Sequence, residues 1–597
     1  MSLVSLYDAA SLWMTPSGAE DGKLFSELPT DGSGDFTFSR GSNLAATRVG
    51  PTGLIEKGRE NLLLQSNSFS TVTWAKSDSI IAGGQSGYDG SSDAWLLSQD
   101  GGSGYVEQAV SQSGVYTLSV YAKAGSYDWL RMRINTTGAT QNGYYDLSNG
   151  TIGGNGLGVD KTIESIGGGW YKCSITSATQ STSIRIYPAF EDGDISGTSG
   201  NIYIQDTQLE VGLAATDYIE TGATTGKAGL LEDEPRLDYS GGATCPSLLL
   251  EPQRTNQVQN SEYYESYATN SASINSNATT SPEGLQNAAE LIEDSSNDNH
   301  FFRIPNLSFT SGTDVVFSVY LKENTRRYAR LRFDNTGGNT RVWVDLRTGE
   351  ITFIDNTNNG VCTSTDVGNG WFRYEFKVTP SNTGTGSVQV FTQSVESVTG
   401  SLQTIYQGDG TSGIYVWGAQ VEQGSYPTSY IPTYGSSVTR SRDDMDTTFS
   451  SPLATNGNVS VLFDFGAAYI SDANSTTNNL EFVFDNGDKI IYNQNSVSQH
   501  RIELNVNGGT EFIYKTFGIL RSVPSKICVV VTNKTYRIFV NGELTSSVGY
   551  FTGTADWTAA ERFASDINEP IGVTPIKQLL LFPTALTDSE CIALTQL

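Results

Sequence analysis

An internal duplication constrains the fold of this chain more than any other feature of its sequence. The segment that begins at Tyr116 reads YTLSVYAKAGSYDWLRMRINTTG, and the segment that begins at Val315 reads VVFSVYLKENTRRYARLRFDNTG. The strings SVYAK and SVYLK lie 199 residues apart, and later blocks recur in the same order after each of them. Because the two copies drift only in gaps rich in Gly, Asn and Thr, we interpret them as duplicated domains.

Each copy alternates apolar and polar residues over short runs, as in WLRMRIN from Trp129 and ARLRFDN from Ala329. Such alternation predicts strands with one buried face, and the Gly, Asn and Asp clusters between the runs predict turns. Several short strands without helical periodicity indicate an antiparallel β-sandwich or a jelly roll. We therefore expect an all-β fold that contains two tandem jelly-roll sandwiches.

The segments around the duplication complete the expected organisation. In the last part of the chain, Asn541-Gly542 predicts a type I′ hairpin turn. Thr587 and Glu590 have the spacing of a capping box, which predicts one short terminal helix. We expect an N-terminal attachment segment over 1–60, a first jelly-roll sandwich over 61–222, a connector over 223–258, a second jelly-roll sandwich over 259–440 and a third sandwich over 441–597.

Composition excludes several classes of function. Asp and Glu number 64 against 36 Lys and Arg, a net charge of −28, so we expect no nucleic-acid partner. Two His residues disfavour a His-dependent hydrolase or a zinc protein, and the five dispersed Cys residues indicate reduced thiols in a chain made in the cytosol. The start of the chain lacks the pattern of a signal peptide, and we expect no membrane insertion.

Two strands offer candidate binding residues on their outward faces. Alternation directs Leu130 inward and places Trp129 and Arg131 outward, and the same parity places Tyr328 and Arg330 outward in the second copy. Aromatic rings beside arginines suit stacking on sugar rings and reading of hydroxyl groups. They also suit a protein partner, and packing in a core or at a subunit interface is the competing interpretation. We expect the site, if there is one, on this outer face.

Catalysis and metal binding have weaker signals. A glycoside hydrolase needs two carboxylates across a cleft, and no string singles out such a pair, so we expect no enzyme and assign no catalytic residue. The Asx-rich loops around Asp192, Asp194 and Asp294 offer oxygen ligands for a structural Ca²⁺ ion, although such loops also form turns without any ion. We expect no other cofactor.

The pattern also resembles known families. The C-terminal segment resembles the concanavalin-A-like, laminin-G-type lectin sandwich, through the strand that leads into Val540-Asn541-Gly542 and the strand from Gln578 to Phe582. The duplicated units look like the jelly rolls of carbohydrate-binding modules. The strings from Asp31 to Asn67 and from Tyr426 to Asp444 are similar to parts of tailed-phage virion proteins, including fibres of crAss-like and marine bacteriophages.

This resemblance implies a homotrimeric fibre or spike located in the virion, on the phage head or tail. The N-terminus would attach to a capsid or tail protein, and the chain would adhere weakly to host-surface glycans and gain avidity from several copies. Two alternatives stay open, a glycan-cleaving tailspike and a purely structural decoration protein without a ligand. The sequence leaves open which end of the chain is distal.

Overall fold

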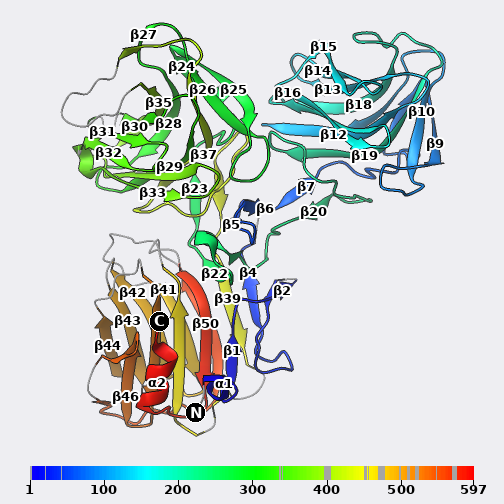
Figure 1. Cartoon of the computed structure of the whole chain (residues 1–597). Coiled ribbons are helices and arrows are strands. Elements are labelled where there is room, and N and C mark those ends of the chain that lie inside the picture. The colour runs from blue at the N-terminus through cyan, green and yellow to red at the C-terminus, as the bar shows by residue number, and fades with distance from the viewer. Residues whose placement is uncertain are drawn as a thin grey trace.

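The computed structural model confirms an all-β fold made of sandwiches. Figure 1 shows three lobes, with the two duplicated sandwiches side by side above a third. Among the described residues, the helix α1 (Leu3–Tyr7) lies near the start of the chain and α2 (Asp588–Thr595) near its end. The structure describes the whole chain except residues 1–2, 21, 42–43, 335–337, 339, 356, 395–404, 450–452, 455, 468–477, 497–498, 507–510, 518–522, 546–547 and 568–573.

The first sandwich consists of two six-stranded antiparallel sheets. Leu118 from one sheet and Leu130 and Ile186 from the other are fully buried in one core. One sheet has the order β16 (Asp160–Gly167), β17 (Trp170–Ser177), β12 (Tyr116–Ala124), β19 (Asn201–Val211), β10 (Ala94–Gln99), β9 (Ser79–Gln85). The other has the order β15 (Thr151–Leu157), β14 (Gln141–Asp146), β13 (Trp129–Thr136), β18 (Ser181–Ala189), β11 (Tyr105–Ala109), β8 (Ala75–Ser77).

The second sandwich repeats this topology strand for strand. The register shift between Ser119 and Tyr121 in the first copy recurs between Ser318 and Tyr320 in the second. One sheet has the order β33 (Val361–Asp366), β34 (Trp371–Val378), β29 (Val315–Glu323), β37 (Gly413–Gln423), β26 (Ala288–Glu293), β25 (Ala272–Thr279). The other has the order β32 (Ile351–Asp355), β31 (Thr340–Asp345), β30 (Tyr328–Asp334), β35 (Gly384–Gln393), β28 (Phe301–Phe309), β24 (Ala268–Asn270).

The third sandwich has two nine-stranded sheets around one core. One contains β21 (Leu237–Asp238), β22 (Ser247–Leu250), β50 (Thr574–Phe582), β40 (Val459–Phe465), β45 (Ser525–Val531), β46 (Thr535–Val540) and β47 (Glu543–Leu544), with β1 (Leu12–Met14) paired to β50 and β48 (Gly549–Tyr550) paired to β46. The other contains β2 (Ala19–Glu20), β3 (Lys23–Leu24), β4 (Phe36–Ser39), β39 (Asp444–Thr448), β49 (Ala560–Ile567), β41 (Asn478–Phe484), β42 (Lys489–Ser496), β43 (Gln499–Val506) and β44 (Glu511–Phe517).

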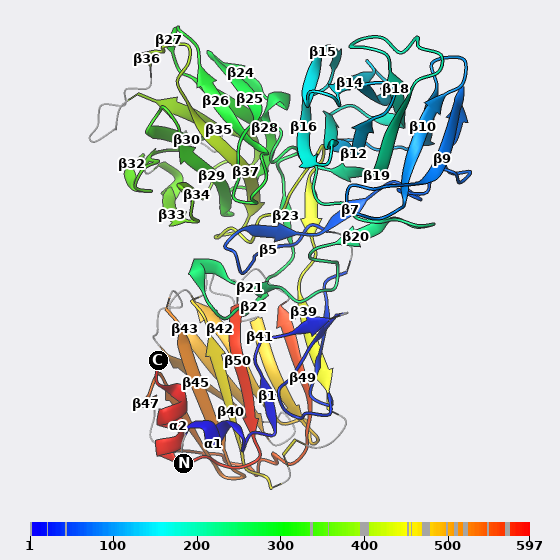
Figure 2. The ribbon, with the colours of Figure 1, turned by 45° about the vertical axis from the view of Figure 1, so that its right-hand side comes forward.

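The third sandwich therefore differs from a module that starts at residue 441. Strands from residues 1–60 and from the connector 223–258 belong to its sheets, because their alternate apolar residues fill its core. Leu12, Phe36 and Leu248 are all fully buried there. The two duplicated sandwiches are thus two successive insertions into one sandwich, the first before β21 and β22 in the chain and the second after them. Figure 2 shows α1 and α2 on the outside of this sandwich, where Leu6 and Leu594 share one small core.

Two predictions for the C-terminal segment are confirmed. Asn541 and Gly542 have φ values of 49° and 84°, as a type I′ turn between β46 and β47 requires. At the start of α2, the Thr587 side chain accepts a hydrogen bond from the backbone N–H of Glu590, and the Glu590 side chain accepts one from the backbone N–H of Thr587. None of the described helices has the length and apolar character needed to span a membrane.

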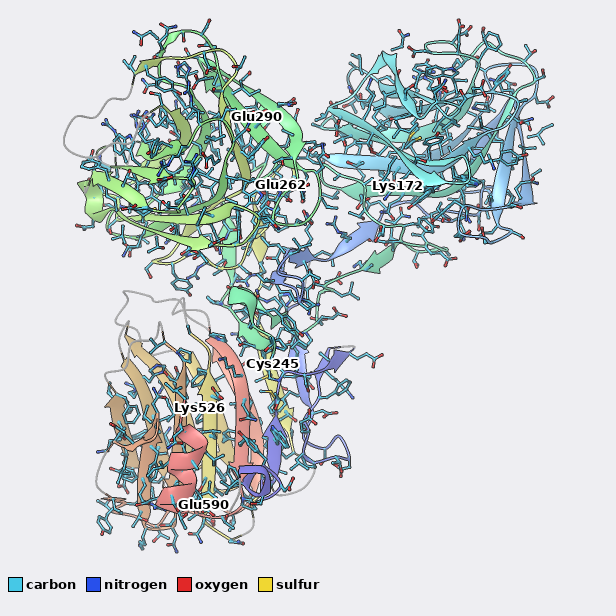
Figure 3. The ribbon with its side chains drawn as sticks, viewed as in Figure 1. Lys172, Cys245, Glu262, Glu290, Lys526 and Glu590 are labelled. Carbon is cyan, nitrogen blue, oxygen red and sulfur yellow. The ribbon has the colours of Figure 1, made fainter. Side chains whose placement is uncertain are left out.

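Buried ion pairs join the lobes. Arg236 Nη1 lies 2.6 Å from Glu251 Oε2, Arg40 Nη1 lies 3.1 Å from Asp443 Oδ1, and Arg440 also pairs with Glu251. Figure 3 labels Cys245 on the connector beside this junction and Glu262 on the side of the second sandwich that faces the first. The short paired strands around the junctions are β5 (Thr47–Val49) with β6 (Ile55–Lys57), β7 (Arg59–Asn61) with β20 (Gly226–Ala228), and β23 (Arg254–Asn256) with β38 (Val438–Arg440).

Minor elements complete the second sandwich and the connector. They are β27 (Asn297–Asp298) with β36 (Tyr406–Gln407), and the short 3₁₀ helices η1 (Ser240–Gly242), η2 (Tyr264–Ser266) and η3 (Thr357–Asn359).

Candidate functional site

The outer face of the sheet that contains β13 has the side-chain pattern that the sequence predicts. Leu130 and Met132 are fully buried in the core of the first sandwich. Trp129, Arg131 and Arg133 alternate with them on the opposite face, and each is partly exposed. The alternation in this strand is therefore confirmed.

Arg131 lies in a row of aromatic rings that crosses this outer face. Its cross-strand neighbours are Tyr144 on β14 and Tyr187 on β18. The guanidinium carbon lies 5.4 Å from the ring centre of Tyr144 and 5.1 Å from that of Tyr187, within the range of cation–π attraction. Tyr105 on β11 extends the row, with its ring centre 4.9 Å from that of Tyr187. We call these four side chains the first aromatic row.

A polar row runs beside the first aromatic row. Arg133 lies between Asn142 on β14 and Arg185 on β18. Arg185 Nε donates a hydrogen bond of 2.9 Å to Glu107 Oε1 on β11, and its guanidinium carbon lies 4.3 Å from the ring centre of Tyr105. The face therefore combines planar rings with planar hydrogen-bonding groups.

The second sandwich has an equivalent row on its outer face. Arg330 lies between Trp343 on β31 and Phe391 on β35, with its guanidinium carbon 5.6 Å and 3.7 Å from their ring centres. Phe301 on β28 completes the row, 4.6 Å from Phe391 between ring centres. We call these side chains the second aromatic row. Its strand positions match those of the first row one for one.

The polar row of the second sandwich has a different composition. Arg332 on β30 lies between Arg341 on β31 and Gln389 on β35, and Arg303 on β28 lies next to Gln389. Arg332 Nη2 lies 3.2 Å from Asp334 Oδ1. Asp355 on β32 is the cross-strand neighbour of Arg341. Arg303 and Arg341 thus occupy the strand positions that Glu107 and Asn142 occupy in the first sandwich.

One candidate residue is less accessible than the sequence predicts. Arg330 lies on the outer face but is only 2% exposed, because it packs between Trp343, which takes the place of a tyrosine of the first row, and Phe391, whose ring centre lies 3.7 Å from the guanidinium carbon. Burial lowers the pKa of Arg330 to about 9, and the nearby charges of Arg341 and Arg332 act in the same direction. Its Nη2 donates a hydrogen bond of 2.9 Å to Asn299 Oδ1. Its Nε and Nη1 have no hydrogen-bond partner among the described residues.

Trp129 and Tyr328 occupy equivalent positions, opposite Asp146 and Asp345 respectively. Both are partly exposed, and each lies two residues before the central arginine of its aromatic row on the same strand. Sequence reasoning did not single out the rings on β11, β18, β28 and β35, because lateral strand order joins segments that are far apart in the chain. The alternation in SIRIYPAF and SVQVFTQ was the available signal, since it directs Tyr187 and Phe391 to the outer face.

Asp194 and Asp294 form local turns, whereas Asp192 accepts hydrogen bonds from the backbone of β15. Asp192 Oδ2 accepts a hydrogen bond of 2.8 Å from the backbone N–H of Gly154, and Asp194 accepts one of 2.7 Å from that of Ser196. Asp294 accepts one of 2.9 Å from the backbone N–H of Ser296. In the part of the chain that the structure describes, no three His, Cys, Asp or Glu residues form a group that could hold a metal ion.

Comparisons with known proteins assign no family to the chain. No protein-family model matches the sequence, and no curated protein matches it either. The solved structures that are similar include the receptor-binding domain of botulinum neurotoxin mosaic serotype C/D, with 12% identity and a TM-score of 0.22 over 25% of this chain. This chain spans 39% of that domain.

Two further neighbours are domains of AbnA and of Xyn10C. Domain 4 of AbnA, a GH43 extracellular arabinanase from Geobacillus stearothermophilus, is 17% identical, with 26% of this chain and 73% of that chain covered and a TM-score of 0.22. The CBM22-1-CBM22-2 tandem domain of Xyn10C from Paenibacillus barcinonensis is 12% identical, with 60% and 97% covered and a TM-score of 0.18. At these scores the likeness supports no conclusion about function.

Proposed function

We propose that this chain is a non-enzymatic adhesion protein that binds glycans through the outer faces of its duplicated sandwiches. The observation that carries the proposal is the recurrence of an aromatic row with a central arginine at matched positions of both sandwiches. A fold alone assigns no function, so the argument depends on these side chains.

The chemistry of the first face fits a sugar ring. A pyranose has an apolar face of C–H groups and a rim of hydroxyl groups, and so needs a flat apolar surface next to directional polar groups. Tyr105 and Trp129 offer partly exposed rings. Arg133, Asn142 and Glu107, in the polar row next to the first aromatic row, supply both donors and acceptors.

We also propose that the chain is a trimeric fibre protein of a phage virion. The resemblance of the strings from Asp31 to Asn67 and from Tyr426 to Asp444 supports this placement. Both strings cross between the third sandwich and the duplicated pair. Because α1 and α2 both pack on the third sandwich, we propose that this sandwich, rather than an extended N-terminal segment, attaches to a capsid or tail protein.

Glycan binding is tested with the full chain on a glycan array. The glycans that the array identifies are then tested as polysaccharides in affinity electrophoresis. We expect the Trp129→Ala/Tyr105→Ala double variant to lose binding to ligands of the first sandwich by on the order of tenfold or more.

Tyr514→Ala is the matched control, since Tyr514 on β44 is 53% exposed and has the Arg501 guanidinium carbon 4.8 Å from its ring centre. It removes an aromatic–arginine pair from the third sandwich and should leave glycan binding unchanged. Equal retention of the wild type and the double variant on every glycan would refute the proposal.

A further inference from the structure

The two outer faces differ in how their positive charges are balanced. In the first sandwich, Glu107 accepts a hydrogen bond of 2.9 Å from Arg185 Nε and a second one of 2.5 Å from Ser183 Oγ. The carboxylate therefore neutralises an arginine within the polar row. The strand position of Glu107 is taken by Arg303 in the second sandwich.

The second face gathers four guanidinium groups, those of Arg303, Arg330, Arg332 and Arg341. Arg332 and Arg341 are direct cross-strand neighbours, an arrangement of like charges that destabilises a sheet. The carboxylates beside this face are Asp334, which pairs with Arg332, and Asp355, the neighbour of Arg341. Among the described residues, Arg303 and Arg330 form no ion pair.

Hydrogen-bonding capacity on this face is also unused. In the described part of the chain, no partner is found for the buried Nε atoms of Arg303, Arg330 and Arg332. The same holds for Trp343 Nε1 and Gln389 Oε1. The first face has unpaired Nε atoms too, on Arg131 and Arg133, but Arg330 Nη1, Trp343 Nε1 and Gln389 Oε1 have no counterpart there among the described residues. Buried groups of this kind are costly to leave unpaired, so this excess on the second face indicates a place where a ligand completes the bonding.

We propose that the outer face of the second sandwich binds a sugar residue that carries an anionic group, a carboxylate in the first instance, whereas the first face binds neutral sugar. This inference rests on the proposed glycan-binding function. Guanidinium groups bind carboxylates through paired hydrogen bonds, and Arg303 and Arg341 are exposed enough to reach one. The net charge of −28 repels long polyanions, which favours a single acidic sugar on an otherwise neutral glycan over nucleic acid.

The experiment measures binding of the full chain by calorimetry and affinity electrophoresis to matched ligand pairs. The probes are sialyllactose with its methyl ester, and galacturonic acid with its methyl ester, so that each pair differs in the anionic group. Sulfated lactose separates a carboxylate from a sulfate as the source of the charge. We expect at least one acidic ligand to bind on the order of tenfold more tightly than its neutral partner, with an affinity that falls as salt is raised.

The test variant is Arg303→Gln/Arg341→Gln, which removes two partly exposed charges and keeps hydrogen-bonding side chains. We expect it to lose the preference for the acidic ligand and to keep its melting temperature. Arg347→Gln/Arg562→Gln removes two charges from exposed positions elsewhere and should keep the preference. Arg133→Gln, which removes the arginine of the first polar row that corresponds to Arg332, should also keep the preference.

The outcomes separate this inference from the proposed function. If neutral glycans bind and depend on Trp129 and Tyr105, but no acidic ligand is preferred, the glycan-binding function stands and the anionic site is refuted. If no glycan binds to either face, both fail. Equal binding of single-stranded DNA and acidic sugar, lost together in Arg303→Gln/Arg341→Gln, would overturn the assignment to a sugar and indicate a general polyanion site.

Discussion

The carboxyl group of Asp206 lies at the irregularity in β19, where the residue has a φ of 50° and is only 5% exposed. Burial raises its pKa to about 7; the hydrogen bond from Tyr88, 2.9 Å long, opposes this shift, and the charges of Asp93 and Asp89 add to it. Burial has thus moved the pKa of this carboxyl group into the neutral range.

This shift makes the stability of the first sandwich depend on pH. A carboxyl with a raised pKa in the folded state costs stability when it ionises, so the wild type should lose stability as the pH rises from the ordinary value of 3.8 to about 7. Asp206→Asn keeps an acceptor for Tyr88 and tolerates the positive φ. We expect its melting temperature to exceed that of the wild type at pH 8, with the difference shrinking at pH 5. Parallel melting curves at both pH values would contradict this.

The strand is the scale at which the sequence was most informative. Alternation in β13 and β30 predicts which side chains face outward, and the duplication predicts that both sandwiches share one strand order. The neighbours of Arg131 and Arg330 could not be predicted, because they come from strands such as β18 and β35 whose lateral positions depend on the whole sheet. The burial of Arg330 depends on how closely the neighbouring rings pack against its guanidinium group, which alternation does not reveal.

The strands β1 and β4 were missed for a different reason. They are three and four residues long, too short for alternation to distinguish them from an extended linker. β4 pairs with β39 about 400 residues later, and β1 pairs with β50 about 570 residues later. Local sequence therefore carries little of the information that places them.

Phe38 offers a test of this placement. It is 2% exposed in the core of the third sandwich, and its backbone partner on β39 is Met445. Phe38→Ala should lower the free energy of unfolding of that sandwich by about 3–5 kcal/mol, through lost burial and a cavity. In calorimetry we expect the transition of the third sandwich to shift and those of the duplicated pair to stay. Phe190→Ala, at a residue that is 54% exposed, is the control. An unchanged scan for Phe38→Ala would mean that the N-terminal strands do not stabilise the sandwich.

At the scale of the whole molecule, the two faces proposed to bind glycans belong to the lobes farthest from the two helices (Figures 1 and 2). The buried pairs of Arg236 and Arg440 with Glu251, and of Arg40 with Asp443, fix the crossings between these lobes and the third sandwich. Because these connecting segments are short and buried, we expect the two duplicated sandwiches to keep a constant orientation relative to the third sandwich.

Cryo-EM of the particle that carries this chain tests the arrangement. We expect the third sandwich against the capsid or tail, the duplicated pair outward with Trp129 and Tyr328 facing solvent, and copies in threefold sets. A chain that lies flat in the particle wall, with those two rings covered, would leave a structural decoration protein in place of an adhesive fibre.

The insertion of both duplicated sandwiches into the third sandwich also dictates an order of assembly during synthesis. Strands β1 to β4 leave the ribosome first, yet β39 follows about 400 residues later, which is roughly 20 to 80 seconds at 5–20 residues per second. Both duplicated sandwiches can close on their own strands during that interval, whereas Leu12 and Phe36 wait with their apolar side chains uncovered. A ribosome that stalls before β39 would release two finished domains joined to an unpaired, aggregation-prone leader. The strands that pair with β1 and β4 from the far end of the chain, β50 and β39, lie in roughly its last quarter.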